Sequence, residues 1–413
     1  MPLVIRCDEL QPGMDLFEDI LWRDRVMLPA GKVLTDTDIA ALHRRFPDLT
    51  IRVKDPVLDE IIEFENDTHD REVAETVKQK IAGAVSTVSE QISSRASMAR
   101  VDFRAVRAAV KQVMHYLSGN PVSAALLART VGGEGYLAEH TGSTFYLSLV
   151  LGAAARPYIA GERQRQSKAR DLQTSVAMDL APLGVGAAFM DLGMISLEHL
   201  YQAKRQPTAE EWQRIWNHPV DGSDMLPDDI SPVAKTVVRY HHENMDGTGY
   251  PSGLTGDKIH VLARVIRIAD AYASATADRV YREARSSVRA LWEMSVGPYR
   301  RFYDPELMKV FTRLIQPFPI GARLVLEDGR TAVVVRYNHA SPFEPIATIA
   351  FDIHGELIPE SELGDAAPLE GEKGFRIKSY DGEDLSYLYD DAANVTPEAP
   401  ARGTTTIFEA AYP

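Results

Sequence analysis

Two neighbouring stretches decide the fold of this chain: HHENMDGTGYPSGLTGDKI at residues 241–259 and RIADAYASATADRVYR at residues 267–282. The first begins with paired histidines and runs directly into a glycine-rich turn, and the second is an apolar helix pattern interrupted by Asp270. Outward from them, from Pro121 to about Gln316, apolar residues keep a helical period. This pattern predicts a mainly α fold for the centre of the chain.

Carboxylates and imidazoles interrupt otherwise apolar segments of this helical region. Asp191 is the only charged residue in residues 181–197, and Asp270 falls on the apolar stripe of its helix. Burying an unpaired carboxylate is very costly, so each needs a cap, a cation or a metal. A single core histidine is most often satisfied by hydrogen bonds alone, but that explanation is weaker for His241 and His242, which are adjacent and precede a glycine-rich turn.

Two further histidines, His140 and His218, extend this set of candidate metal ligands. Neutral imidazoles and shared carboxylates carried on helices are what a dinuclear site for first-row metals needs. Two metals roughly 3.5–4 Å apart activate a bridging water and stabilise an in-line displacement at phosphorus. The ligands are scattered along the chain, so spacing alone does not establish the site. A cysteine-based site is excluded, because Cys7 is the only cysteine.

Length and charge limit the class of protein. With 413 residues the chain exceeds one ordinary core, so we expect two or three domains. A net charge of −14 argues against binding nucleic acid polymers or anionic membranes. The single cysteine fits a reducing cytoplasm, and the first residues, MPLVIRCDEL, lack the features of a signal peptide. The longest apolar stretch, residues 183–197, is short for a membrane span. We therefore expect a soluble, cytoplasmic protein.

Changes in pattern along the chain divide it into five segments. Short β-prone runs broken by proline and glycine predict a small β-rich module at residues 1–60, with a helix that Thr35 caps. Apolar stripes predict two connecting helices at 69–120, before the helical domain at 121–316. Two β-prone runs flanking Asp328 and Gly329 predict a hairpin in a second small β module at 317–390. The remaining segment, 391–413, is rich in Pro, Ala and Thr, and we expect it to be disordered.

The two stretches quoted above resemble the HD-GYP family of bacterial cyclic di-GMP phosphodiesterases, which belongs to the HD superfamily. The order and spacing of the motifs match from about Gly135 to Tyr281, and the HHE…DGxGYP element is highly specific. The resemblance implies an HD-type helical bundle core. It also implies a divalent metal, Fe or Mn, and it assigns the metal ligands to His140, Asp191, His218, His241, His242 and Asp270. Among these, Asp191 is the aspartate of the HD pair, which usually bridges the metals.

The same resemblance implies how the nucleotide is held. Gly249, Tyr250 and Pro251, with Gly247, match the GYP turn, which shapes the edge of the pocket and contacts guanine or a partner domain. Arg279 and Arg282 match basic residues that hold the substrate phosphates, a role suited to the Arg fork. The implied ligand is cyclic di-GMP or a related nucleotide, and the implied protein partners are diguanylate cyclases that contact the GYP face.

Two methionines depart from the family pattern. The segment FMDLGMISL at residues 189–197 stands where the family has HD-x-GK, so Met190 replaces the histidine and Met194 replaces a lysine that supports the substrate phosphate. A thioether is a soft, neutral ligand and a poor match for Fe or Mn. One metal should therefore lose an imidazole, keeping at most His140, Asp191 and Asp270. We predict one retained metal, at the ligands Asp191, His218, His241 and His242, and a second that is weak or absent.

Three functions remain compatible with these departures. The first is a degenerate domain that binds metal and cyclic di-GMP with weak or no hydrolysis and signals through partners. The second is an active metal-dependent phosphodiesterase, slow or directed at another phosphate ester. The third is an interaction scaffold without a ligand. Intact Arg279, Arg282 and most of the core ligand positions count against the third, and Met190 with Met194 counts against the second. We favour the first.

Overall fold

The structure is a computed structural model. It describes residues 3–7, 10–17, 19–22, 25–46, 50–54, 136–167, 172–201, 205, 207–277, 284–371 and 375–389. Two compact units divide the chain, one formed by Met1–Asp67 with Gln316–Asp391 and one that includes Thr68–Ile315. The predicted connecting helices at 69–120 and the tail at 391–413 lie outside the described residues.

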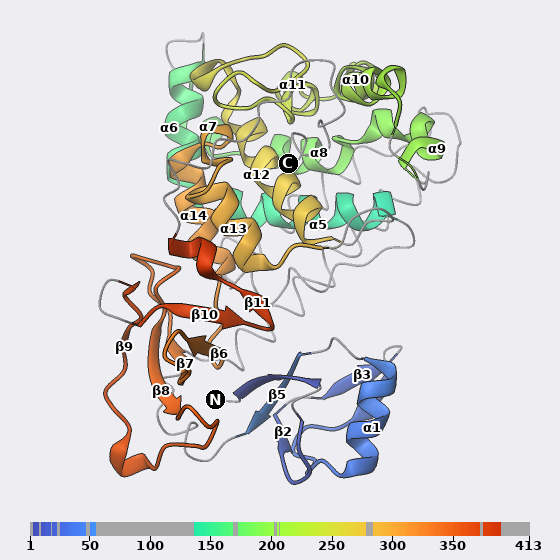
Figure 1. The fold of residues 1–413 in the computed structure, drawn as a ribbon. Helices are drawn as coiled ribbons and strands as arrows, with labels where there is room; N and C mark the ends of the chain where they lie inside the picture. Colours follow the sequence, from blue (N-terminus) through green and yellow to red (C-terminus); the bar gives the residue numbers. More distant parts are fainter. Residues whose placement is uncertain are drawn as a thin grey trace. The chain divides into compact units, whose positions relative to one another are not determined.

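The described part of the second unit is helical (Figure 1). Its elements are α5 (Tyr136–Ala154), α6 (Arg156–Gln166), α7 (Thr174–Ala177), α8 (Ala181–Phe189), the 3-10 helix η4 (Leu192–Leu197), α9 (Glu198–Tyr201), α10 (Ala209–Met225), α11 (Pro232–Tyr240), η5 (Gly256–Lys258), α12 (Val261–Thr276), α13 (Ser287–Ser295), η6 (Arg300–Phe302) and α14 (Pro305–Ile315). The predicted mainly α fold, with small β-rich modules towards both ends of the chain, is confirmed.

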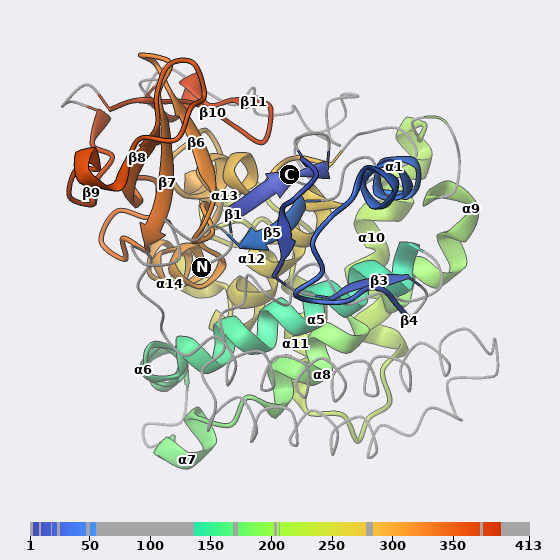
Figure 2. The same cartoon turned by 90° about the horizontal axis from the view of Figure 1, so that it is seen from below.

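Helix α12 is the core of this unit, because every residue from Val261 to Ala275 is buried. A helix that is buried on all sides can be stable only when other helices surround it. Helices α5, α8 and α11 pack against α12, and α5 and α11 also pack against α8 (Figure 2). The same packing covers the apolar segment Thr174–Leu197, the one described stretch long and apolar enough to cross a membrane. The most apolar 18 consecutive residues of this segment are 72% buried, as in the core of a folded domain.

Local capping explains where the helices that carry the site begin. At α10, Thr208 and Glu211 form a capping box, in which the Thr208 side chain accepts from the Glu211 amide and the Glu211 carboxylate accepts from the Thr208 amide. Helix α11 begins at Pro232 after the N-cap residue Ser231, whose side chain makes no capping hydrogen bond. Both starts lie about ten residues before histidines of the candidate site.

The first unit is built from antiparallel sheets contributed by both ends of the chain. Its strands are β1 (Leu3–Arg6), β2 (Asp15–Leu16), β3 (Ile20–Trp22), β4 (Arg25–Leu28), β5 (Thr50–Lys54), β6 (Arg323–Leu326), β7 (Thr331–Arg336), β8 (Ile346–Phe351), β9 (Ala367–Pro368), β10 (Ile377–Tyr380) and β11 (Glu383–Asp384). The strand orders are β1-β5-β2, β3-β4 and β11-β10-β6-β7-β8-β9. It also contains α1 (Asp36–Arg45), η7 (Glu360–Glu362) and η9 (Ser386–Tyr389).

One hydrophobic core joins the two terminal parts of this unit. Ile5, Leu16 and Leu42 from the N-terminal part share a buried cluster with Val333 and Ala350 from the C-terminal part. Two sequence predictions are confirmed here. Thr35 caps α1 through a capping box, and the turn at residues 328–329 joins β6 to β7 in an antiparallel pair. The two β modules that the sequence separates therefore share a core.

Candidate metal centre

Three helices and two turns that follow helices bring the candidate ligands together. Helix α5 carries His140, and the turn between α8 and η4 carries Asp191. Helix α10 carries His218 in its second half, and His241 and His242 directly follow the end of α11. Asp270 lies in the buried helix α12. Five of the six residues are buried, and His242 is nearly so.

Four of these residues form a group able to hold a metal ion. One ligand atom from each of Asp191, His218, His241 and His242 lies within 4.8 Å of all the others, and this is the one such group found among the described residues. The Nε2 atoms of His218 and His241 are 3.4 Å apart, and His218 Nε2 lies 3.4 Å from Asp191 Oδ1. Three imidazoles and a carboxylate are a suitable donor set for a first-row divalent metal.

Backbone carbonyls determine which ring nitrogen of His218 and of His241 is available to bind a metal. The Nδ1 atoms of His218 and His241 lie 2.6 and 2.7 Å from the carbonyl oxygens of Ile215 and Val238. A carbonyl can only accept, so each Nδ1 carries the hydrogen and each neutral ring leaves a bare lone pair on Nε2. Those two lone pairs face each other at 3.4 Å, a repulsive arrangement that a cation between them would relieve. This polar support is the kind that orients metal-bound histidines in proteins.

His140 and Asp270 adjoin the four-residue group. His140 Nε2 is 2.9 Å from Asp270 Oδ1 and 3.7 Å from Asp191 Oδ2. The other oxygen of Asp270, Oδ2, lies 3.6 Å from His242 Nδ1. The shortest of these contacts is a hydrogen bond that His140 donates to Asp270. The structure thus brings all six predicted ligands into one cluster, with His140 and Asp270 paired at its side.

Burial and the neighbouring groups together set the protonation states of these ligands. Burial, followed by the nearby His218, lowers the pKa of His241 to about 4. Burial and the neighbouring His241 lower the pKa of His242 well below its usual value. For Asp270, burial raises the pKa, but the hydrogen bond from His140 and the neighbouring imidazoles outweigh it, so the net pKa is lowered. At neutral pH His241 and His242 are therefore neutral and Asp270 is ionised, and these are the forms that bind metals.

The glycine-rich turn is held against this cluster by Glu243, which is 1% exposed. Its carboxylate accepts from the backbone amides of Ser252 at 2.7 Å and Leu254 at 2.9 Å. Gly249 is required by close packing, because a Cβ there would meet the Asn244 nitrogen at 2.3 Å and the His242 carbonyl oxygen at 2.4 Å. Charge-assisted hydrogen bonds and this close approach fix the path of the turn.

The turn places an aromatic ring on the ligands. The ring of Tyr250 stacks on His242, with centroids 4.7 Å apart and 22° between the planes. Its backbone amide donates to the carbonyl of His242 at 3.1 Å. Tyr250 also meets His218 edge-on at 6.5 Å. The predicted GYP residues Gly249, Tyr250 and Pro251 therefore lie beside the candidate ligands.

A second glycine sets the spacing between two ligand-bearing elements. A Cβ at Gly193, in η4, would meet the carbonyl oxygen of His218 at 2.3 Å and the nitrogen of Gly222 at 3.0 Å. Since η4 follows Asp191 directly and α10 carries His218, this backbone contact sets how closely the two ligands approach. Only glycine allows it, because any side chain would occupy the space of the α10 backbone.

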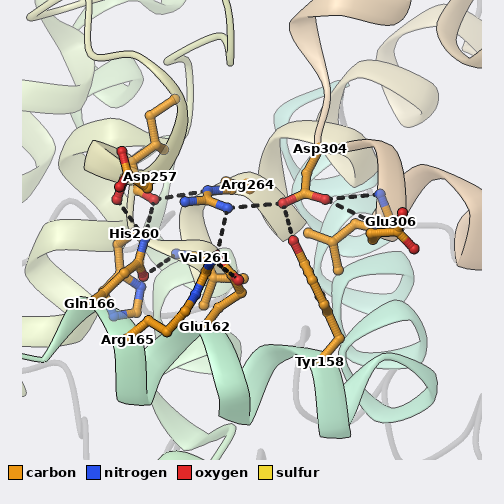
Figure 3. A network of polar contacts seen from close by, with 12 residues as sticks. Tyr158, Glu162, Arg165, Gln166, Asp257, His260, Val261, Arg264, Asp304 and Glu306 are labelled. Carbon is orange, nitrogen blue, oxygen red and sulfur yellow. Dashed lines mark hydrogen bonds and ion pairs between the residues drawn. The ribbon is translucent and has the colours of Figure 1, made fainter.

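Buried ion pairs anchor the first turn of α12, the helix that carries Asp270. Figure 3 shows Arg264 between two carboxylates, and its Nη1 donates to Glu162 and to Asp304, each at 3.0 Å. Asp304 also accepts from the hydroxyl of Tyr158 at 2.8 Å. These contacts join α12 to α6 and to the start of α14.

His260 caps α12 beside this network. Its side chain accepts from the backbone amide of Leu262 at 3.2 Å. Burial, with Arg163 and Arg264 nearby, lowers the pKa of His260 to about 4. The cap therefore depends on a neutral imidazole, which accepts through Nδ1.

The remaining predicted positions divide into buried and undescribed ones. Met190 is fully buried at the end of α8, and Met194 is half-buried in η4. Arg279 and Arg282 lie outside the described residues. Sequence reasoning missed Glu243, although its place directly after the paired histidines could have identified it. It also missed the support that the Ile215 and Val238 carbonyls give to the histidines, which leaves no trace in the sequence.

Comparison with known proteins finds related sequences over the helical unit. The HD domain family model matches residues 166–307. A cyclic di-GMP phosphodiesterase of Pseudomonas aeruginosa is 29% identical over 198 residues, covering 46% of this chain and 47% of that protein. A 3'3'-cGAMP-specific phosphodiesterase of Vibrio cholerae is 31% identical over 174 residues, covering 40% of this chain and 37% of that protein. The chain therefore matches less than half the length of these relatives.

Among solved structures, Bd1817, an HDGYP protein of Bdellovibrio bacteriovorus, aligns with 76% of this chain and 99% of its own. The TM-score is 0.43 and the sequence identity 13%, a likeness too low to bear on function.

Proposed function

Because this chain contains an HD domain, with relatives that are cyclic dinucleotide phosphodiesterases, we propose that it is a degenerate HD-GYP-type protein of cyclic di-GMP signalling. In this proposal it binds one divalent metal, Fe or Mn, and cyclic di-GMP, with weak or no hydrolysis. The metal lies at Asp191, His218, His241 and His242, and the nucleotide phosphates are held by Arg279 and Arg282. The protein acts in the cytoplasm through partners such as diguanylate cyclases.

The observation that carries this proposal is the composition of the four-residue group. It joins one carboxylate with three imidazoles, and two of the imidazoles have their lone pairs directed by backbone carbonyls. Such a set is sufficient for one metal without a ligand from Met190. When bound, a metal there would supply a Lewis acid for a phosphate oxygen or a water molecule. The chain's own residues supply the orientation, because Glu243 and Gly249 hold the turn that packs on His242.

The pairing of His140 with Asp270 supports a weak second site. Their 2.9 Å hydrogen bond places a hydrogen on His140 Nε2, the nitrogen that would otherwise bind a metal. A second metal would have to break this bond and displace the proton, and Met190 offers no imidazole in return. Hydrolysis that depends on a water held between two metals should fall accordingly.

An active phosphodiesterase is the second candidate, favoured by the activities named for the relatives. Two measurements separate the candidates: metal content per chain after anaerobic loading with Mn²⁺ or Fe²⁺, and breakdown of cyclic di-GMP followed by chromatography. The wild-type chain is compared with Asp191→Ala and with the double variant Met190→His, Met194→Lys, which restores the family pattern.

We expect one metal per wild-type chain, binding of cyclic di-GMP and little or no turnover, with a second metal and measurable turnover in the double variant. Multiple turnover by the wild-type chain, abolished in Asp191→Ala, would instead establish the active phosphodiesterase. If the wild-type chain binds neither metal nor nucleotide, it is a scaffold without a ligand and the proposal is wrong.

A further inference from the structure

A row of aromatic rings runs from the candidate ligands to helix α10. Tyr250 stacks on His242 at 4.7 Å, and Trp216 lies 6.5 Å from Tyr250 at an interplanar angle of 45°. Trp212, one helical turn before Trp216, stacks behind it at 6.4 Å and 28°. The row thus begins at a ligand of the metal group and continues through the turn onto a neighbouring helix.

Trp216 and Trp212 differ in exposure, although they stack on each other. Trp212 is 4% exposed and belongs to the core, whereas Trp216 is only half-buried. Trp216 also comes two residues before His218, so the rigid helix that presents a ligand presents this ring too. A tryptophan supported from behind by another ring and fixed on a helix is preorganised, and it loses little conformational entropy when a planar group stacks on it.

Stacking of a nucleobase on such a ring is energetically substantial. Base–aromatic stacking contributes about 1–3 kcal/mol per base and tolerates any base, because every base has a π face. A phosphate ester held at the metal group would carry its base within reach of the neighbouring aromatic rings. The arrangement of a cation site beside aromatic rings suits a nucleotide better than a simple phosphate ester, which has no planar group to offer.

We propose that Trp216 is a specificity-determining residue that stacks on a guanine base of the bound nucleotide. This inference deepens the proposed function and rests on it. Trp216 makes the site prefer nucleotide esters over phosphate esters of the same charge that have no aromatic group. It acts on binding and positioning, so its removal weakens nucleotide affinity and leaves affinity for the metal unchanged.

The test compares affinities of the metal-loaded chain for two probes, cyclic di-GMP and inorganic phosphate, by calorimetry. The variants are Trp216→Ala, Trp216→Phe and, as a matched control, Trp292→Phe in α13. A stack worth about 1–3 kcal/mol predicts that Trp216→Ala weakens cyclic di-GMP binding by about 5- to 150-fold and leaves phosphate binding unchanged. Trp216→Phe should restore most of the affinity, because it keeps an aromatic face.

Intrinsic fluorescence gives a second readout that a purely structural role would not change. The chain has four tryptophans. Cyclic di-GMP should quench the emission of the wild-type chain and of Trp292→Phe, and Trp216→Phe should lose most of that quenching. This measurement also decides the matter if Trp216→Ala does not fold.

The outcomes separate the inference from the function on which it rests. If the wild-type chain binds cyclic di-GMP and Trp216→Ala binds it equally well, the stacking role is wrong and the proposed function stands. If Trp216→Ala loses affinity for cyclic di-GMP and for inorganic phosphate equally, the stacking role is also wrong, because equal losses indicate a general disturbance of the site. If the wild-type chain binds metal and phosphate but no cyclic di-GMP, the proposed function fails and the inference fails with it.

Discussion

Replacing Gly193 with alanine should separate two metal ligands without changing either of them. The added Cβ would lie 2.3 Å from the carbonyl oxygen of His218, and contacts between such atoms need at least 3.0 Å, so η4 and α10 must move apart by about 0.7 Å (3.0 − 2.3) or more. That movement also acts on the 3.4 Å approach of Asp191 Oδ1 to His218 Nε2. Metal–ligand distances tolerate only about 0.2 Å, so the metal group should be disrupted.

The expected effect is a loss of metal affinity of about 10- to 100-fold, comparable to the loss of a supporting residue around a metal site. Overpacking of this kind should also cost about 1–3 kcal/mol of unfolding free energy. Gly161→Ala is the matched control, because Gly161 is an exposed glycine of α6 with nothing within 4 Å of the new Cβ. It should leave affinity unchanged and slightly raise stability.

Calorimetric titration of the metal-free proteins with Mn²⁺ measures the affinity, and thermal unfolding with and without the metal measures the coupling between binding and stability. If folded Gly193→Ala binds Mn²⁺ as tightly as the wild-type chain, then this backbone contact does not set the ligand spacing, and the reasoning is refuted.

Three further substitutions test the supports of the site. Glu243→Ala removes the acceptor of two backbone amides. It should lower the free energy of unfolding by about 3 kcal/mol and speed hydrogen exchange at both amides. Arg264→Met leaves two buried carboxylates without a counter-charge and should cost about 3–5 kcal/mol in urea unfolding, against under about 1 kcal/mol for Arg239→Met at an exposed ion pair. His260 has a folded-state pKa of about 4, below the unfolded value of about 6.5, so the unfolded chain binds the proton first and stability falls as the pH drops from 6.5 towards 4. His260→Asn keeps a capping side chain that does not titrate. Its free energy of unfolding should match that of the wild-type chain at pH 7.5 and exceed it by on the order of 2 kcal/mol at pH 5. Equal acid sensitivity of the two proteins would contradict this.

Local patterns in the amino-acid sequence, together with the family resemblance, predict which residues are candidate metal ligands. Asp191 and Asp270 are carboxylates within apolar segments, and the cost of burying them unpaired is enough to indicate that each needs a cap, a cation or a metal. The paired histidines after α11 follow a helix whose start could be predicted from Ser231 and Pro232. Such features are local, because each depends on residues within a few turns of one another.

Other features of the site depend on contacts between distant segments and leave no local pattern. In the sequence Gly193 is one glycine among 27, and only the approach of the α10 backbone shows that it spaces two ligands. The stack of Trp212, Trp216 and Tyr250 likewise joins a helix to a turn more than about 30 residues away. For the same reason, the sequence does not show that two β modules from opposite ends share one core.

That shared core imposes an order on how the chain folds during synthesis. Ile5 and Leu16 emerge from the ribosome early in synthesis. The strands that share their core, β7 and β8, are synthesised only after the whole helical unit. At about 5–20 residues per second, the gap lasts on the order of tens of seconds. The helical unit has time to fold first, while the N-terminal strands remain exposed to chaperones and to other nascent chains. The helical unit can therefore complete its folding before the unit built from both ends of the chain can form its core.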